Sequence, residues 1–352
     1  MNDFLRVLSL KIDPGDSSIN NGKLLKFVSD GSIYTLSISA SIHMTRDISG
    51  QNATITIYNL SRSTSADLMR MIKSKSNVVQ INAGYIADSL IYESLNYTGK
   101  GLSYDEYSSL IYPLDRLPVV FIGTIKTVNL KKTGENVVTE IVCATLNYNM
   151  AKSRANFQFN SGTTLSNVIS KIASTLPVGS INKSWMSNSL FNRKLSRSFS
   201  VNEPTIDALN NLSKMYGFTW WIDKNKFMCK ADDDMQQPPS SGIRTLSSKT
   251  GLIYATPKLV NGTATAQSIQ ISHIFTTEVF PGDWVYIESK YLTDWLGVID
   301  LYGMNNKYGP YLIATVDAEL DTKSDSWESE MTVFTQTDNT TKIPFTMPIQ
   351  GV

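Results

Sequence analysis

The sequence predicts a mainly β fold in which two related β-domains flank an α+β insert. The same strand pattern occurs twice, at 78–85 with 119–146 and again at 283–288 with 311–336. In both copies a β-rich run is interrupted, resumes as a long strand, turns through a polar stretch and returns as a further strand. Between the copies, the spacing of apolar residues changes from that of strands to that of helices. Two related β-domains in one chain suggest a protein that matches a structure of higher symmetry.

The first β-domain is predicted at 1–155. Apolar and polar residues alternate at 53–58, as they do in a half-buried strand. A Ser/Thr start followed by apolar residues at helical spacing predicts one short helix at 63–72, packed on the sheet. Residues 141–146 are almost apolar on both faces, which is typical of a strand in a closed or covered barrel.

An insertion at about 86–118 interrupts the first copy and is rich in tyrosine. Tyrosine favours contact surfaces because it combines an apolar body with a hydroxyl group. The candidates for partner contacts here are Tyr104, Tyr107 and Tyr112. The alternative is a loop to which nothing binds.

The middle of the chain predicts an α+β unit at 156–235. Apolar residues at 165–176 follow the helical i, i+3, i+4 rule and stop before a proline and a glycine. A second helix opens at Pro204 and stops at Gly217. Its inward residues are expected to be Ile206, Leu209, Leu212 and Met215. A hairpin at 218–229 completes the unit.

A linker, a second β-domain and an arm complete the predicted organisation. Residues 236–250 are polar and rich in Pro, Gly and Ser, which predicts a domain linker. The second β-domain is expected at 251–337, and residues 338–352 have no helix or strand pattern. The apolar residues on alternate positions of this segment are Ile343, Phe345, Met347 and Ile349. They favour an extended arm that binds a neighbouring subunit or another partner, and the alternative is a frayed terminus.

Composition excludes several classes of partner. The chain has 32 Lys and Arg against 31 Asp and Glu, so its net charge of +1 gives no overall field that would hold nucleic acid or an anionic membrane. No apolar run is long enough to span a bilayer, and the N-terminus lacks a signal-peptide pattern, so we expect a soluble protein without stable membrane insertion. The two cysteines, Cys143 and Cys229, lie in apolar strand patterns and are expected to be buried structural thiols.

The sequence shows no pattern of a catalytic or metal site. The only two histidines, His43 and His273, lack the partners that hydrolytic constellations and imidazole-rich metal sites require. The aspartates at 232–234 lack the glycine bend and final glutamate of a calcium loop. The acidic residues at 317–325 alternate along one predicted strand and its turn, which is typical of a solvated sheet face rather than a glycosidase pair. We therefore predict a protein that is not an enzyme and has no cofactor or metal.

Several runs resemble one known family. Phe280-Pro281-Gly282-Asp283-Trp284, continuing to 289, followed by 311–316 and 320–327, resembles the C-terminal barrel of phage baseplate hub proteins. The ordered set of these runs carries the resemblance, because each run alone is common.

The rest of the chain resembles the same family in the same order. Residues 162–165, 200–209 and 217–222 are similar to its insert domain. Residues 81–85 and 121–125 are similar to its first barrel. The resemblance covers nearly the whole chain. The family that it indicates includes the late-control D-type hubs of contractile-tailed phages and the hub half of type VI secretion spikes.

This resemblance implies two tube-like antiparallel β-barrel domains flanking the insert, and a homotrimer with six such barrels in a ring. It implies a structural symmetry adaptor in the virion tail baseplate, assembled in the host cytoplasm. Its partners would be the hexameric tail tube protein, the trimeric central spike protein and the baseplate wedge proteins. DNA would pass through the lumen without specific binding.

Two other functions fit the sequence. One is the hub of a phage-derived injection machine or a type VI-like system. The other, from a different class, is a carbohydrate-binding or hydrolytic tail protein that uses Trp220, Trp221 and Trp295 as a sugar platform.

Overall fold

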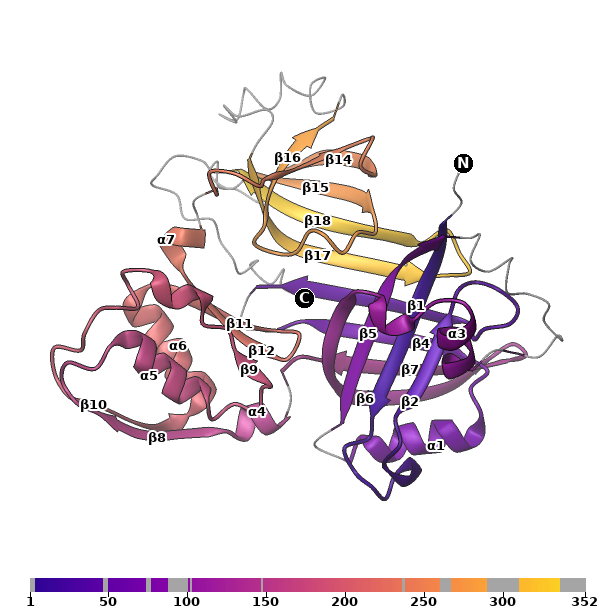
Figure 1. Ribbon diagram of the computed structural model, residues 1–352, viewed down its shortest axis with the longest axis horizontal. Coiled ribbons are helices and arrows are strands. Elements are labelled where there is room, and N and C mark those ends of the chain that lie inside the picture. The colour runs from indigo at the N-terminus through magenta and orange to yellow at the C-terminus, as the bar shows by residue number, and fades with distance from the viewer. Residues whose placement is uncertain are drawn as a thin grey trace.

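Strands dominate the computed structural model of the chain (Figure 1), so the predicted mainly β fold with helices is confirmed. The structure describes residues 4–46, 50–73, 77–87, 101, 103–146, 148–235, 238–259, 267–289 and 310–335. Figure 1 shows one large β body, built from both ends of the chain, and a smaller α+β lobe built from its middle. None of the helices among these residues is long and apolar enough to cross a membrane.

The large body contains two sets of strands and, among the described residues, four helical elements. The first set is β1 Phe4–Asp13, β2 Leu25–Ser29, β3 Ile38–Thr45, β4 Asn52–Tyr58, β5 Val78–Ala87, β6 Val119–Thr133 and β7 Asn136–Ala144. The second set is β13 Arg244–Ser247, β14 Leu252–Leu259, β15 Gln267–Ile274, β16 Trp284–Glu288, β17 Tyr311–Asp321 and β18 Trp327–Thr335. The helical elements are α1 Arg62–Met71, α3 Tyr104–Leu110 and η2 Leu114–Arg116, with a short η1 at Asn20–Gly22. Below, the first copy means β1–β7 and the second copy means β13–β18.

The two copies share one sheet. Its strand order is β14-β15-β18-β17-β3-β4-β7-β6-β5-β1-β2, with β16 paired to β17 and β13 paired to β16. The copies meet where β17 pairs antiparallel with β3, from Thr315 opposite Thr45 to Asp321 opposite Ser39. We call this pairing the in-chain seam.

The strand order repeats between the copies. The path β3-β4-β7-β6-β5 in the first copy matches β14-β15-β18-β17-β16 in the second. Both long strands carry a register irregularity at the same place, at Ile125/Thr127 in β6 and at Ile313/Thr315 in β17. After it, Val128 pairs with Ile141, as Val316 pairs with Met331. This common register gives residue-by-residue equivalences, whereas the exact domain boundaries stay a prediction.

One continuous apolar core lies under this sheet. Alternate residues of each strand point into it because successive side chains of a strand face opposite sides. Ile42 of β3, Ile55 of β4 and Leu320 of β17 all belong to the same buried cluster, so the in-chain seam lies over core on both sides. Helix α1 adds Leu68 and Met71 to the cluster, as its predicted amphipathic pattern requires.

The insert forms its own core. Its elements are α4 Tyr148–Lys152, β8 Arg154–Phe159, α5 Leu165–Ala173, β9 Ser180–Ile181, η3 Ser184–Ser187, β10 Phe199–Pro204, α6 Thr205–Tyr216, β11 Phe218–Asp223, β12 Lys226–Ala231 and α7 Asp232–Met235. Helix α6 begins directly after Pro204 and ends at Gly217, whose φ of 76° is left-handed. The prediction that Met215 points inward is wrong. Its side chain is 66% exposed because the buried face of α6 is made by Ala208, Leu209 and Leu212.

Candidate functional site

The main candidate surface among the described residues is the polar face of eight adjacent strands, β14-β15-β18-β17-β3-β4-β7-β6. Its side chains alternate with those that enter the core, so the face is polar across both copies. On β3 and β4 they include Ser39, Ser41, His43, Thr54 and Thr56. The sheet therefore separates an apolar interior from one broad hydrophilic wall.

The second copy carries most of the acid on this wall. The carboxylates are Asp317, Glu319 and Asp321 on β17 and Glu328 and Glu330 on β18. Asp317 lies directly opposite Glu330, and Glu319 lies directly opposite Glu328. Like charges directly opposite each other on paired strands destabilise a sheet. Strand pairing alone therefore does not favour this arrangement.

Neutral donors on the neighbouring strands hold the carboxylates of β18. The Tyr254 hydroxyl donates to Glu330 (2.8 Å), and the Gln270 side-chain amide donates to the other oxygen of Glu330 (2.8 Å). The Ser272 hydroxyl donates to Glu328 (3.1 Å). The hydrogen bond to Glu330, with burial and the nearby carboxylate charges, raises the pKa of Tyr254. The donors fix the side chains without neutralising their charge.

Polar contacts also cross the in-chain seam. The Ser41 hydroxyl of β3 donates to Glu319 of β17 (2.5 Å). His43 Nδ1 lies 2.5 Å from Asp317 Oδ1. The two copies are therefore joined on the wall by polar pairs and beneath it by the shared core.

The first copy has a different charge on the same wall. Among its described strands, the wall carries a single carboxylate, Glu140 of β7. It accepts a hydrogen bond from the Asn129 amide (3.1 Å) and lies 3.8 Å from the Lys131 ammonium group. The register places Lys131 where the second copy has Glu319. The wall is therefore acidic over the second copy and nearly neutral over the first.

The two outer edges of this eight-stranded stretch form a second surface. Among the described residues, 124–133 of β6 pair only with β7, and β14 pairs only with β15. Large apolar side chains are exposed at both edges. Leu130 is 41% and Val137 43% exposed beside β6, and Ile253 is 49% exposed on β14. We call these two strands the free edges.

A half-buried arginine, Arg46, joins the insert to both copies. The Arg46 guanidinium lies 3.4 Å from Asp283 and 5.0 Å from the centre of the Trp221 ring. It packs directly on Gly282, where an added Cβ would lie 2.1 Å from Nη1. Burial lowers the pKa of Arg46, and Asp283 and Asp223 oppose that shift. A polar cavity of about 660 Å³ lies beside this contact and is also lined by Lys230.

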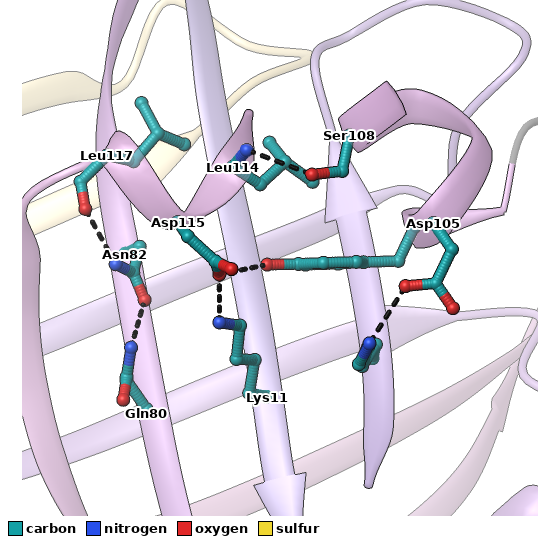
Figure 2. A network of polar contacts seen from close by, with 10 residues as sticks. Lys11, Gln80, Asn82, Asp105, Ser108, Leu114, Asp115 and Leu117 are labelled. Atoms are coloured by element: carbon teal, nitrogen blue, oxygen red, sulfur yellow. Dashed lines mark hydrogen bonds and ion pairs between the residues drawn. The ribbon is translucent and has the colours of Figure 1, made fainter. Parts of the chain in front are cut away.

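The tyrosines of the first insertion pack within the chain. Tyr107 is fully buried and Tyr104 nearly so, in a cluster that covers β1, β2 and β5. The Tyr104 hydroxyl donates to Asp115 (3.4 Å), which also pairs with Lys11 (Figure 2). Tyr112 is partly buried against the same cluster. The structure thus uses these rings to hold the insertion on the sheet, and a role in partner binding stays a prediction.

An ion pair and a hydrogen bond hold the two ends of the same insertion on the sheet. Lys26 of β2 pairs with Asp105 of α3 (2.8 Å), and its ammonium group lies 5.4 Å from the centre of the Tyr104 ring. At the other end, the Asn82 amide donates to the Leu117 carbonyl (2.7 Å), as Figure 2 shows. The other predicted partner residues, Ile343, Phe345, Met347 and Ile349, lie outside the described residues.

The second histidine and the two cysteines are buried. His273 is buried and its Nδ1 contacts the Ile274 carbonyl (2.5 Å), and burial lowers its pKa. Cys143 and Cys229 are buried as predicted, and burial raises the pKa of Cys143 to about 12. Within the described ranges, no group of three or more His, Cys, Asp or Glu side chains could hold a metal ion.

The predicted sugar platform does not form from the paired tryptophans. Trp220 lies in the core of the insert, stacks on Phe227 at 5.8 Å and donates from Nε1 to the Asn210 side chain (3.0 Å). Trp221 is buried beneath Arg46. Trp295 lies outside the described residues. Two tryptophans that the sequence offered for sugar binding therefore serve packing.

Comparison with known proteins identifies the family. A model of the family described as baseplate hub gp41 matches residues 27–290. The chain belongs to this family. Its members are structural proteins of the phage tail baseplate, which places this hub in the tail of a virion. No curated protein sequence matches the chain significantly.

Solved structures share the fold of this hub at low sequence identity. The 43 kDa tail protein of prophage MuSo2 from Shewanella oneidensis is 8% identical with a TM-score of 0.55, over 95% of this chain and 97% of that one. A tail protein from Neisseria meningitidis is 11% identical with a TM-score of 0.53, over 93% and 96%. A chain of the half-lidded Francisella PdpA–VgrG complex is 9% identical with a TM-score of 0.55, over 98% of this chain and 60% of that one.

Proposed function

We propose that this hub acts as a homotrimer that adapts the sixfold symmetry of a tail tube to the threefold symmetry of a central spike. Each chain supplies two copies of one β-unit, so three chains supply six units. The polar wall would line the channel through which DNA passes. The hub would have no enzymatic activity, and baseplate wedge proteins would bind around it.

The observation that carries this proposal is the in-chain seam. There, β17 of the second copy pairs with β3 of the first. In the repeat, the counterpart of β17 is β6, and the counterpart of β3 is β14. These are the two free edges. If the same type of contact is made again, β6 of one chain pairs with β14 of the next, and the association is head to tail.

Side-chain exposure supports this pairing. The register makes Leu130 equivalent to Ala318, and Val137 equivalent to Trp327. Ala318 of β17 is fully buried and Trp327 at the start of β18 is 2% exposed, whereas both counterparts are more than 40% exposed. The free edge of β6 thus presents apolar side chains at positions that are buried in the second copy.

A closed ring of three chains would have a wall of 24 strands, because each chain contributes eight. Its charge would be threefold rather than sixfold. Three acidic stripes from β17 and β18 would alternate with three nearly neutral stripes from β3, β4, β6 and β7. Carboxylates repel phosphate, so such a wall lets DNA slide without gripping it. A DNA-binding surface would instead require clustered Lys and Arg.

The test is the mass of the assembled hub. Native mass spectrometry, with the spike protein present, should show three copies. Leu130→Asp or Ile253→Asp should reduce the trimer fraction, because burial of each apolar side chain is worth about 1.5–3 kcal/mol, or at least tenfold in association at each seam. Met215→Asp is the matched control, since Met215 is 66% exposed on α6 of the insert, which forms neither edge. Equal effects of all three changes would contradict the proposal.

The same adaptor role would apply to the hub of a phage-derived injection or type VI-like system. Isolation of the hub with tails attached to DNA-filled capsids supports the phage form. Tails that are never attached to capsids support the other form.

A further inference from the structure

A small slot on the second copy is open, and its counterpart on the first copy is filled by the chain itself. The open slot has a volume of about 270 Å³. It lies between the loop that follows β13, the start of β14 and the end of β16. Its lining includes Ser247, Ser248, Lys249, Ile253 and Glu288.

The filled counterpart shows what such a slot accepts. The loop that follows β2 leads into β3, as the loop that follows β13 leads into β14. The turn between β17 and β18 lies on this first loop. The Ser29 and Thr322 hydroxyls are hydrogen-bonded (2.6 Å), and the Thr322 carbonyl oxygen lies 2.4 Å from where a Cβ on Gly31 would be. Gly31 also has a φ of +83°, so only glycine allows this close approach.

The register identifies the turn that would fill the open slot. The turn between β6 and β7 is the counterpart of the turn between β17 and β18. It consists of Gly134 and Glu135, between the paired residues Thr133 and Asn136. Within this chain a Cβ on Gly134 would meet no atom within 4 Å, and Glu135 is exposed. Within a single chain, the β6–β7 turn and the slot are therefore both accessible.

We propose that the slot receives the β6–β7 turn of the next copy of this chain, an inference that rests on the proposed trimer. The turn region carries Lys132 and Glu135, and the slot carries Glu288 and Lys249, so both surfaces offer opposite charges. The two-residue turn is also shorter than the in-chain turn of 322–326. Each copy gives one turn and accepts one, so a ring leaves no turn unbound.

The experiment is cysteine cross-linking of the trimer. The variant Glu135→Cys with Ser248→Cys places one thiol on the turn and one at the slot, both exposed, whereas the native cysteines are buried. Oxidation, and in parallel a short bismaleimide that tolerates imperfect thiol geometry, should give covalent trimers on a non-reducing gel. A mixture of the two single variants should stop at dimers, because each chain then has one reactive end. Glu135→Cys with Asp207→Cys, on the exposed face of α6, is the control and should give no ladder.

The possible outcomes distinguish failure of the proposed turn–slot contact from failure of the proposed hub function. Native mass spectrometry of the same samples reports the copy number. A trimer that gives no more cross-linking than the Asp207 control would overturn the slot and leave the hub role intact. An assembly that is not a trimer would contradict both proposals.

Discussion

Gly282→Ala tests the contact that joins the insert to both copies. Gly282 has a φ of +82°, and an added Cβ would lie 2.1, 2.4 and 2.6 Å from three atoms of the Arg46 side chain. The left-handed backbone costs a residue with a Cβ about 1–2 kcal/mol. Displacement of the guanidinium also removes its contact with the Trp221 ring, worth about 1–2 kcal/mol when desolvated, and weakens its pairing with Asp283. We therefore expect a loss of about 2–4 kcal/mol in the free energy of unfolding.

The assay is urea denaturation monitored by tryptophan fluorescence. Two comparisons separate the cost of the left-handed backbone from the cost of the lost Arg46 contacts. Gly242→Ala is the matched control, because Gly242 also has a φ of +82° but a Cβ there would meet nothing within 4 Å. It should lose only the backbone term of about 1–2 kcal/mol. In an Arg46→Ala background, Gly282→Ala should likewise lose only that term. Equal losses for Gly282→Ala in the two backgrounds would refute the proposed contact with Arg46.

Three further results are expected. Burial lowers the pKa of His273, so the folded state binds this proton less well than the unfolded state. The contribution of His273 to the free energy of unfolding is therefore full above the ordinary pKa of about 6.5 and falls as the pH drops below it. His273→Gln should flatten that decline in urea titrations. Zymograms on peptidoglycan and on host glycans should show no lysis by the hub or by its His43→Gln variant, and lysis that this change removes would contradict a purely structural role. Truncation after Gln336 should leave the chain folded yet weaken capture of the trimer or the spike in a pull-down, and unchanged capture would show that residues 337–352 are dispensable.

Local sequence patterns predicted the local structure well. Alternation at 317–321 predicted a solvated acidic face, and Asp317, Glu319 and Asp321 do share one face of β17. Helix α6 begins and ends where Pro204 and Gly217 predicted. These features depend on residues close together in the chain, so periodicity and backbone preference determine them.

Features that depend on distant pairings could not be predicted. Nothing in the sequence of β3 or β17 indicates that these strands pair with each other across about 270 residues of chain. The acidic wall continues onto β15 through Gln270 and Ser272, and polar residues on alternate positions at 268–272 were the available signal. Nothing in the local sequence around Arg46 indicated its contacts, since its partners come from the insert and from the second copy.

Tyrosine content and helical periodicity were ambiguous for a physical reason. Tyr104 and Tyr107 combine apolar rings with hydroxyls, which suits a partner surface and equally suits a helix that covers the chain's own sheet. Met215 fits the periodicity of α6, but Tyr216, one residue later, packs against the insert core in its place, and Met215 faces outward. Only tertiary packing decides such positions.

A cryo-EM reconstruction of the assembled tail tests the central claim most directly. The account predicts three copies of the hub in one ring, with β6 of each chain paired to β14 of the next and Glu330 facing the channel. A ring with another number of copies, or one in which the acidic wall faces away from the channel, would contradict it.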